Sequence, residues 1–301
     1  MLNIYEQVDR NKRKSAIIMV LFISFIATVA WILAQALGYG LSFVGWALVL
    51  SGLMSFFSYY FSDRIILSIS GARPASKKKD FHFYTVTQNL IMVARIPMPK
   101  LYVINDSAMN AFATGRDPKH AVVVATTGLL SRLNRTELEG VIAHELSHIK
   151  NYDIRLMSLV TVLVGIITLL ADWFLRASLF GGGRNRKEGG QITVIIMIVG
   201  FILALLSPLI ANLIKLAISR RREFLADASA TAITKYPEGL AKALDKLSKD
   251  REPLEAANKA TAHLYITNPL KNLHGGIGWF AGLFNTHPTI RERITALRKS
   301  I

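Results

Sequence analysis

Two histidines four positions apart carry the clearest chemical signal in the chain. The segment His144-Glu145-Leu146-Ser147-His148 has the spacing H-E-x-x-H. Histidines four apart on a helix project from one face, so their imidazoles can take adjacent corners of a zinc tetrahedron. Glu145 lies about a third of a turn away, beside the water that such a metal activates. The pattern predicts metal-assisted hydrolysis with Glu145 as general base. The alternative is two surface histidines on an amphipathic helix.

The third ligand of such a site is not part of the motif. A catalytic zinc needs three protein ligands and an open position for water, but the positions where Gly and His would complete a three-histidine site hold Asn151 and Ile154. Glu223 and Asp227 are four apart on a predicted helix, so one can bind the metal while the other orients a histidine. Alternatively, Glu223 pairs with the neighbouring arginines. The residues able to supply the ligand are Glu223, Asp227, Glu238, His263, His274 and His287. The chain has no cysteine, so thiolate ligands and disulfides are excluded.

The motif lies in a segment with helical periodicity. Thr136 to Glu139 has the pattern of a capping box, and apolar residues recur at helical spacing through Ile149. Upstream, 101–104 and 121–125 are short β-branched runs bounded by turn residues, and 110–114 is predicted to pair with the second run across 116–119. Further helices are predicted over 222–234, 237–247 and 290–297. The soluble part should be mostly helical with a small sheet.

Four apolar stretches indicate a membrane protein. Hydrophobic residues make up 51% of the 301 residues, and residues 16–37, 41–61, 156–175 and 192–218 are each long enough, at about 20 residues, to span hydrocarbon as helices. The first lacks a small-residue cleavage site, so it is predicted to be an anchor and not a removed signal peptide. The alternative is a set of long buried helices in a soluble core, although such helices are usually shorter.

Basic residues are placed beside these stretches. Lys and Arg number 36 against 20 Asp and Glu, with clusters at 12–14, 77–79 and 220–222. This placement favours anionic lipid, and no nucleic-acid-binding motif is present. The positive-inside rule puts the N-terminus in the cytoplasm, and four spans return the chain to that side. The basic loop 176–190 disagrees, because this topology places it outside.

These patterns predict an α-helical integral membrane protein with a mostly helical, cytoplasmic, zincin-like metalloprotease domain that contains a small β-sheet. A basic cytoplasmic tail covers 1–15 and two transmembrane helices cover 16–61. A catalytic part with the metal motif covers 62–155. Two further apolar helices, transmembrane or membrane-associated, cover 156–218, and a catalytic part with the third ligand covers 219–301.

Several motifs in order resemble one family. The segments HELSHIKN at 144–151 and RREFLADA at 221–228, separated by two apolar stretches, look like the HtpX family of bacterial membrane zinc metalloproteases, relatives of the prenyl-protein (CAAX) endoproteases. NAFATG at 110–115 and Thr286-His287-Pro288 with Arg293 also match. The similarity covers essentially the whole chain. A single proline after His287, where many relatives have two, is a departure that concerns the loop.

The resemblance implies roles for individual residues around one Zn²⁺ per chain. The implied ligands are His144, His148 and Glu223. Asp227 is expected to support a ligating histidine and Arg293 to buttress the ligand glutamate, and we also expect Asn151 to support the metal site. His287 matches a histidine that helps to hold the developing oxyanion. The implied substrate-facing edge strand begins with Asn110, Ala111 and Phe112.

The resemblance also implies a cellular role. It predicts a multi-pass endopeptidase of the bacterial cytoplasmic (inner) membrane, with its active site facing the cytoplasm. The expected substrates are misfolded or damaged membrane proteins, with unfolded cytoplasmic proteins as a second class, in quality control under stress. The expected partners are protein substrates and the lipid bilayer, without nucleic acid.

Other function classes stay open at this point. A membrane scaffold or adaptor with structural zinc would have a fourth protein ligand and a dispensable Glu145. A small transporter is a poor match, because the apolar stretches offer only Asp172, Asn212 and Lys215 near their ends as a polar pathway. The glycine-rich segment 275–284 is compatible with a cover, an interfacial anchor or a plain loop. Oligomeric state, cleavage preference and the choice among divalent ions are not encoded in these patterns.

Overall fold

The computed structural model of the chain describes residues 4–37, 40–165, 220–250, 252, 254, 261, 264–266 and 288–299. Several predictions fall outside these residues. They concern His287, two other candidate ligands (His263 and His274), the glycine-rich segment 275–284, the fourth apolar stretch and all of the third after residue 165.

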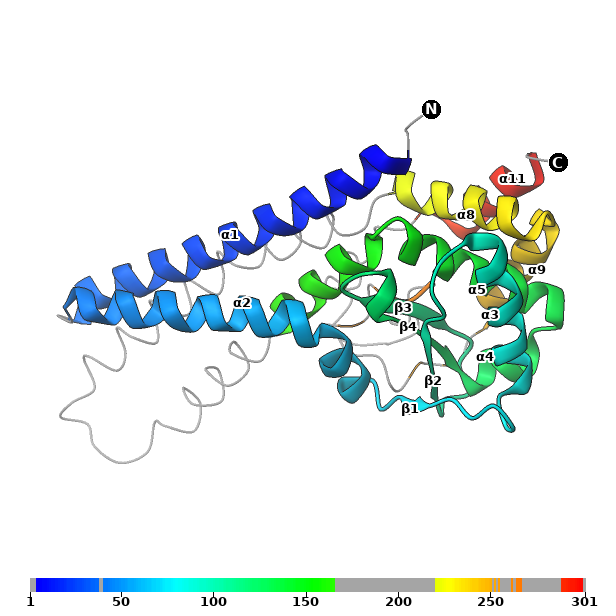
Figure 1. Cartoon of the computed structure of the whole chain (residues 1–301), viewed down its shortest axis with the longest axis horizontal. Helices are drawn as coiled ribbons and strands as arrows, with labels where there is room; N and C mark the ends of the chain where they lie inside the picture. The colour runs from blue at the N-terminus through cyan, green and yellow to red at the C-terminus, as the bar shows by residue number, and fades with distance from the viewer. Residues whose placement is uncertain are drawn as a thin grey trace.

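Two long helices form an antiparallel hairpin that projects from a more compact part of the chain (Figure 1). They are α1 (Ile4–Leu37) and α2 (Leu41–Ile69), and they pack against each other. Both extend beyond the predicted spans into polar sequence, so α1 includes the basic residues 12–14. By length and composition, Val44–Ile69 is a candidate membrane span within the described residues, with a mean hydropathy of 1.4.

A small mixed sheet has the strand order β1-β2-β4-β3. Its strands are β1 (Arg73–Pro74), β2 (Lys100–Ile104), β3 (Ala111–Gly115) and β4 (Ala121–Thr126). Parallel pairing joins β2 to β4, and antiparallel pairing joins β3 to β4 across a turn that contains the short helix η1 (Pro118–His120). The predicted pairing of 110–114 with 121–125 is confirmed. In this order of the described strands, β3 is at the edge of the sheet.

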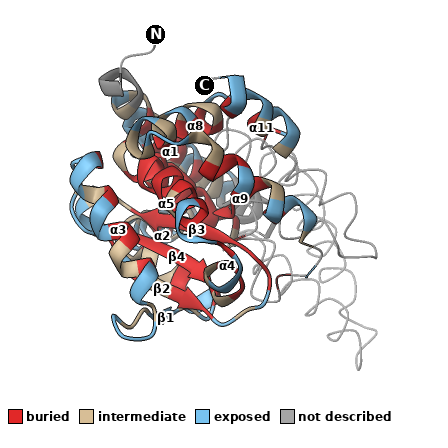
Figure 2. Cartoon of the chain, turned by 90° about the vertical axis from the view of Figure 1, so that its right-hand side faces the viewer, coloured by how far each residue is buried: buried red, intermediate tan, exposed pale blue. Residues whose placement is uncertain are grey.

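The helix that carries the metal motif, α5 (Arg135–Lys150), is at the centre of the compact part. It contacts α3 (Phe81–Ala94), α8 (Arg220–Thr234), α9 (Pro237–Lys249) and β3. Figure 2 shows buried residues concentrated along α5 and the sheet. The predicted helices at 222–234, 237–247 and 290–297 are confirmed, the last as α11 (Ile290–Lys299). The sequence reasoning missed α3 and the short α4 (Thr127–Arg132).

The start of α5 differs from the prediction. The N-cap is Asn134, not Thr136: the Asn134 side chain accepts a hydrogen bond from the Glu137 N–H, and the Glu137 carboxylate accepts one from the Asn134 N–H. The predicted capping box of Thr136 and Glu139 is therefore wrong. The Thr136 hydroxyl serves the real cap instead, because Thr136 Oγ1 donates to Asn134 Oδ1. Asn and Thr are both favourable N-cap residues, and in this helix Asn134, two positions before Thr136, is the N-cap.

Candidate metal centre

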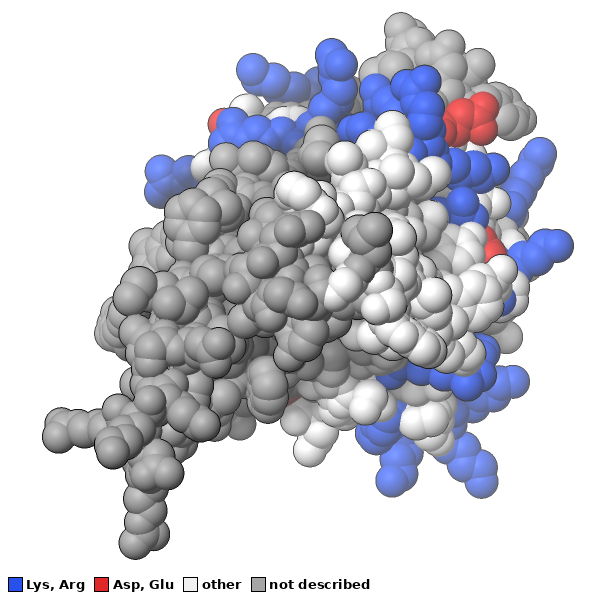
Figure 3. Space-filling model, turned by 90° about the vertical axis from the view of Figure 1, so that its left-hand side faces the viewer, with Lys and Arg blue, Asp and Glu red and all other residues white. Residues whose placement is uncertain are grey.

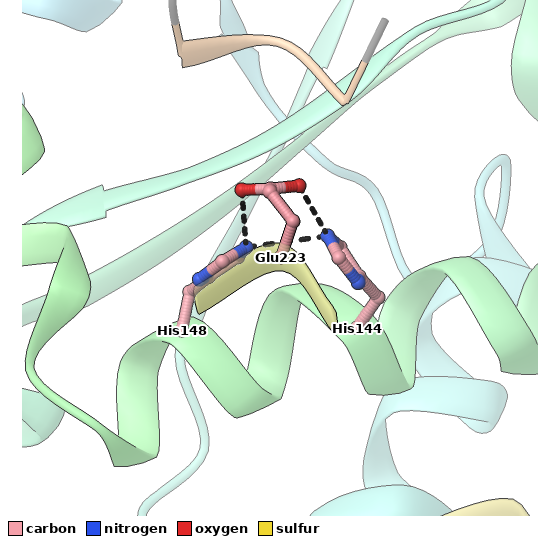
Figure 4. Close-up of side chains that lie close together, drawn as sticks. All are labelled: His144, His148 and Glu223. Carbon is pink, nitrogen blue, oxygen red and sulfur yellow. Dashed lines mark hydrogen bonds and ion pairs between the residues drawn. The ribbon is translucent and has the colours of Figure 1, made fainter. Parts of the chain in front are cut away.

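Three buried side chains from two helices converge on one point (Figure 4). His144 and His148 lie one turn apart on α5, with their Nε2 atoms 3.2 Å apart. Glu223 reaches the same point from the first turn of α8, with a carboxylate oxygen 3.7 Å from each Nε2 atom. All three donor atoms lie within 4.8 Å of one another. Of the six candidates for the third ligand, Glu223 is the one that the structure brings into this cluster of described residues.

A carboxylate fixes the far nitrogen of His144. Asp227, one turn after Glu223 on α8, has Oδ1 2.9 Å from His144 Nδ1. Arg293 of α11 donates two bonds to the same carboxylate, from Nη2 at 2.6 Å and from Nε at 2.9 Å. Arg293 Nη1 also lies 3.5 Å from Glu223 Oε2. Because a bidentate Arg–carboxylate pair is rigid, α11 holds both acidic residues of α8 in place.

A second carboxylate fixes His148, and sequence reasoning missed it. Asp153 Oδ2 lies 3.0 Å from His148 Nδ1. Its other oxygen accepts a 2.7 Å hydrogen bond from Asn11 of α1, and the same amide donates to the Asn151 carbonyl at 2.9 Å. Arg222 Nη1 is 3.8 Å from Asp153. Asn151 itself caps the C-terminus of α5, so it lies beside this network. The only available sequence signal was an Asp five residues after the motif.

Glu145 lies between the two histidines in the sequence and is 2% exposed. Burial, helped by the negative charge of Glu223 and opposed by the charges of His148 and Arg293, raises the pKa of its carboxyl group to about 7. The carboxylate also accepts a hydrogen bond from the Ala113 backbone of β3. The edge strand and the predicted base are thus in direct contact.

The two imidazoles differ in proton affinity. Burial, with the positive charge of Arg293, lowers the pKa of His144 to about 4 despite its bond to Asp227. Burial also disfavours the charged form of His148, but the bond to Asp153 and the charge of Glu223 outweigh it and raise the pKa to about 9. A ligating imidazole must be neutral. In the metal-free protein, His144 is ready to bind while His148 must first release a proton.

The donor set suits a zinc ion. Two nitrogens at corners of a tetrahedral zinc site lie about 3.3 Å apart for Zn–N bonds of about 2.0 Å, close to the 3.2 Å between the two Nε2 atoms. Two imidazoles and one carboxylate are a common catalytic ligand set, and each ring has a carboxylate on its other nitrogen, as ligating histidines usually do. The residues present therefore fit a divalent metal.

The residues predicted to face the substrate lie at or next to β3. Asn110 directly precedes the strand, and Ala111 and Phe112 begin it; all three are buried. The Phe112 ring packs edge-on against Tyr265, with centroids 5.0 Å apart. The Ala111 carbonyl accepts a hydrogen bond from the Ile266 N–H at 3.1 Å. Part of the strand's outer edge is therefore paired within the chain.

Comparisons with known proteins agree with these observations. The model of the family described as "Peptidase family M48" matches residues 77–301. A "Protease HtpX homolog" of Dictyoglomus thermophilum is 44% identical over 294 residues, which cover 98% of this chain and 94% of that protein. Another, of Streptococcus uberis, is 38% identical over 302 residues, 98% and 99% of the two chains. The crystal structure of S. mikatae Ste24p is similar with a TM-score of 0.44 and 19% identity, over 84% of this chain and 64% of that one.

Proposed function

Because the chain belongs to peptidase family M48 and is a metalloendopeptidase of the HtpX type, we propose that it uses one Zn²⁺ held by His144, His148 and Glu223. The proposed reaction is the cleavage of proteins at the cytoplasmic face of a bacterial inner membrane. The observation that carries the proposal is the convergence of these three buried donors beside Glu145. Among the residues that the structure describes, three donors converge, which leaves a coordination position for water as a catalytic zinc requires.

In the proposed mechanism, Glu145 moves the protons. A bound zinc ion would lower the pKa of water toward about 7 and polarise the scissile carbonyl. Glu145 accepts the proton of the attacking water and passes it to the leaving amine. Its pKa of about 7, raised by burial, suits a base that works near neutral pH. Asp227 and Asp153 keep the two Nδ1 protons in place, so that both Nε2 lone pairs face the metal.

Substrate binding at β3 is part of the same proposal. An extended peptide would add as a strand to the outer edge of β3 near Asn110, Ala111 and Phe112. This mode of binding recognises the peptide backbone more than its side chains. The peptide would replace the Ile266 bond to Ala111. It would also displace Glu145 from the Ala113 N–H and free the base to meet water. His287 is proposed to help to hold the oxyanion.

The cellular part of the proposal follows from the family and from the chain's composition. A multi-pass placement, with the catalytic parts 62–155 and 219–301 in the cytoplasm, would bring membrane proteins within reach of β3. We infer that misfolded or damaged membrane proteins are the main substrates, with unfolded cytoplasmic proteins as a second class. The relatives' names support a protease, and the hairpin of α1 and α2 supports membrane attachment.

The test uses the full-length chain in detergent, loaded with zinc, and follows cleavage of casein. Glu145→Ala should retain zinc but lose turnover, and Glu223→Ala should lose zinc. Glu139→Ala is the matched control, because Glu139 lies on the outer side of α5 and pairs with Arg135. Cleavage of casein at the parent rate by the Glu145→Ala variant would disprove the role of Glu145. Unchanged zinc content in the Glu223→Ala variant would move the third ligand elsewhere.

A further inference from the structure

Cationic side chains from three distant segments meet in a hollow beside α2. The hollow has a volume of about 200 Å³. Its Lys and Arg residues are Arg64 of α2, Lys100 at the start of β2, and Arg116 and Lys119 of the β3–β4 connection, while one carboxylate, Asp63, lines it. Like charges that converge repel one another, and an anion placed among them would relieve the repulsion.

Two of the arginines are held in place by aromatic rings of α2. The Arg116 guanidinium lies 5.2 Å from the Tyr60 ring centroid and donates to the Tyr60 carbonyl at 3.1 Å. Arg64 lies 5.5 Å from the Phe61 ring centroid. Since these contacts fix the guanidinium groups before any ligand arrives, a bound anion would pay little ordering entropy.

Acidic neighbours neutralise only part of this charge. Asp117 lies 3.6 Å from Arg116 and 2.8 Å from His120, which also lines the hollow. Among the described residues, no carboxylate is within ion-pair distance of Arg64, Lys100 or Lys119. Lys100 and Lys119 are exposed, so both are accessible to a ligand.

The hollow lies where the apolar surface of the hairpin ends. Exposed large apolar side chains of α2 run from Trp46 to Tyr60, and Asp63 and Arg64 follow. Beyond them the helix has one more large exposed apolar side chain, Ile69, at the end of the candidate span. On the antiparallel α1, exposed apolar side chains begin at Ile17, after the exposed Lys12 and Arg13. Figure 3, a view from the hairpin end, shows Lys and Arg side chains above and below the uncharged surface. If the hairpin crosses a bilayer, this is the level of the lipid phosphates.

We propose that this hollow binds the phosphate of an anionic phospholipid headgroup. The proposal rests on the membrane placement of α1 and α2 and not on the peptidase chemistry. Arg116 directly follows β3, so a lipid held here would fix the end of the edge strand at the bilayer surface. The strand proposed to receive substrate would then lie where segments of membrane proteins emerge.

The experiment measures binding of a fluorescent short-chain phosphatidylglycerol to the full-length protein in neutral detergent. In the test variant, Lys100→Gln and Lys119→Gln are combined, because neither lysine is in the site of catalysis. Lys242→Gln with Lys299→Gln is the control, because both lysines are exposed and lie outside the hollow and outside the three basic clusters, and their removal changes the net charge by the same amount. We expect the test variant to bind phosphatidylglycerol about thirtyfold more weakly and the control to bind like the parent. Thermal unfolding of both variants verifies that the fold is intact.

Competitors distinguish the possible ligands. Unlabelled phosphatidylglycerol should displace the probe, whereas phosphatidylcholine and inorganic phosphate at the same concentration should not. Equal binding by the test and control variants would overturn the site. Displacement of the probe by inorganic phosphate at the same concentration as the lipid would show that the hollow binds free anions, and it would overturn the proposal of a lipid ligand. Casein cleavage is measured separately, so its failure would affect the proposed function alone.

Discussion

At the scale of single residues, burial gives Glu145 a pKa suited to a general base and also lowers the stability of the metal-free protein at high pH. Its carboxyl group is 2% exposed, and burial raises its pKa from 4.5 to about 7. Below about pH 4.5 this carboxyl group is protonated in both the folded and the unfolded state. Between about pH 4.5 and 7 the unfolded state has released the proton while the folded state still holds it, so the free energy of unfolding falls as the pH rises. The metal-free protein therefore carries a destabilising buried charge at alkaline pH.

Glu145→Gln should stabilise the metal-free protein at pH 8. Glutamine has nearly the same shape and no charge, and a pKa difference between 4.5 and about 7 corresponds to roughly 3 kcal/mol as an upper value. The measurement is thermal unfolding of parent and variant in detergent with a chelator, across pH 4.5 to 8. The variant's advantage should shrink as the pH falls toward 4.5. An advantage that does not depend on pH would mean that the carboxylate charge is not its cause.

At the scale of secondary-structure elements, α1 is joined to the metal helix by a polar contact. Asn11 is 2% exposed and donates to Asp153 and to the Asn151 carbonyl. Asp153 in turn holds His148 Nδ1. A buried amide in this position ties the proposed membrane hairpin to a metal ligand, because loss of its hydrogen bonds would leave the Asp153 carboxylate less well oriented.

Asn11→Ala should weaken zinc binding by about tenfold, as loss of such supporting contacts usually does. Zinc affinity is measured by competition with a chromophoric chelator, which reports the site without relying on turnover. Ser15→Ala is the control one turn along α1, since its buried hydroxyl donates only to the Asn11 carbonyl in the same helix. Equal zinc affinity in the two variants would show that α1 does not support the ligand.

The contact between α5 and α9 depends on a glycine. A Cβ atom at Gly140 would lie 2.6 Å from the Leu240 nitrogen and 2.7 Å from its Cα atom. Both are backbone atoms, so a side chain there would force the two helices apart. The closeness explains why a glycine is tolerated in the middle of α5 despite its low helix propensity.

Gly140→Ala should therefore lower the free energy of unfolding by about 1–3 kcal/mol, as overpacking of a core usually does. Thermal or denaturant unfolding measures the change. Gly52→Ala on α2 is the matched control, because its Cβ would meet no atom within 4 Å. Equal stability of both variants would show that α5 and α9 can separate at no cost.

At the scale of the whole molecule, charge and shape together suggest one orientation. The formal net charge is +16, and the apolar hairpin projects from one side of the compact part (Figure 1). Among the described residues, Lys and Arg gather where the hairpin joins that part and are absent from the connection at Gly40. This distribution is the one that the positive-inside rule requires for the orientation proposed above, with the compact part in the cytoplasm and the tip outside.

Thiol labelling can verify this orientation, because the chain has no cysteine of its own. Lys78→Cys, before α3, should react with a membrane-impermeant maleimide in inverted vesicles but not in intact spheroplasts. Gly40→Cys should show the opposite pattern. Both residues are exposed, so access to solvent does not limit the reaction. The reverse result would place the compact part outside.

The sequence by itself determined the features that depend on local periodicity and composition. The helix of His144 and His148, the β3–β4 pairing and the apolar helices α1 and α2 all follow from spacing and composition within one segment. Boundaries were less well predicted: Asn134 replaced Thr136 as the cap of α5 because two adequate capping residues compete within three positions.

Only the tertiary structure decided which distant groups meet. Of the three candidate ligands that the structure describes, Glu223, Asp227 and Glu238, the packing of α8 on α5 puts Glu223 3.7 Å from both imidazoles. Asp153 and Asn11 carry no local pattern that marks them, since their role depends on a hydrogen bond between residues 142 positions apart. Spacing along a chain fixes which side chains share a face of one element, but the distance between elements is set by how their buried faces pack.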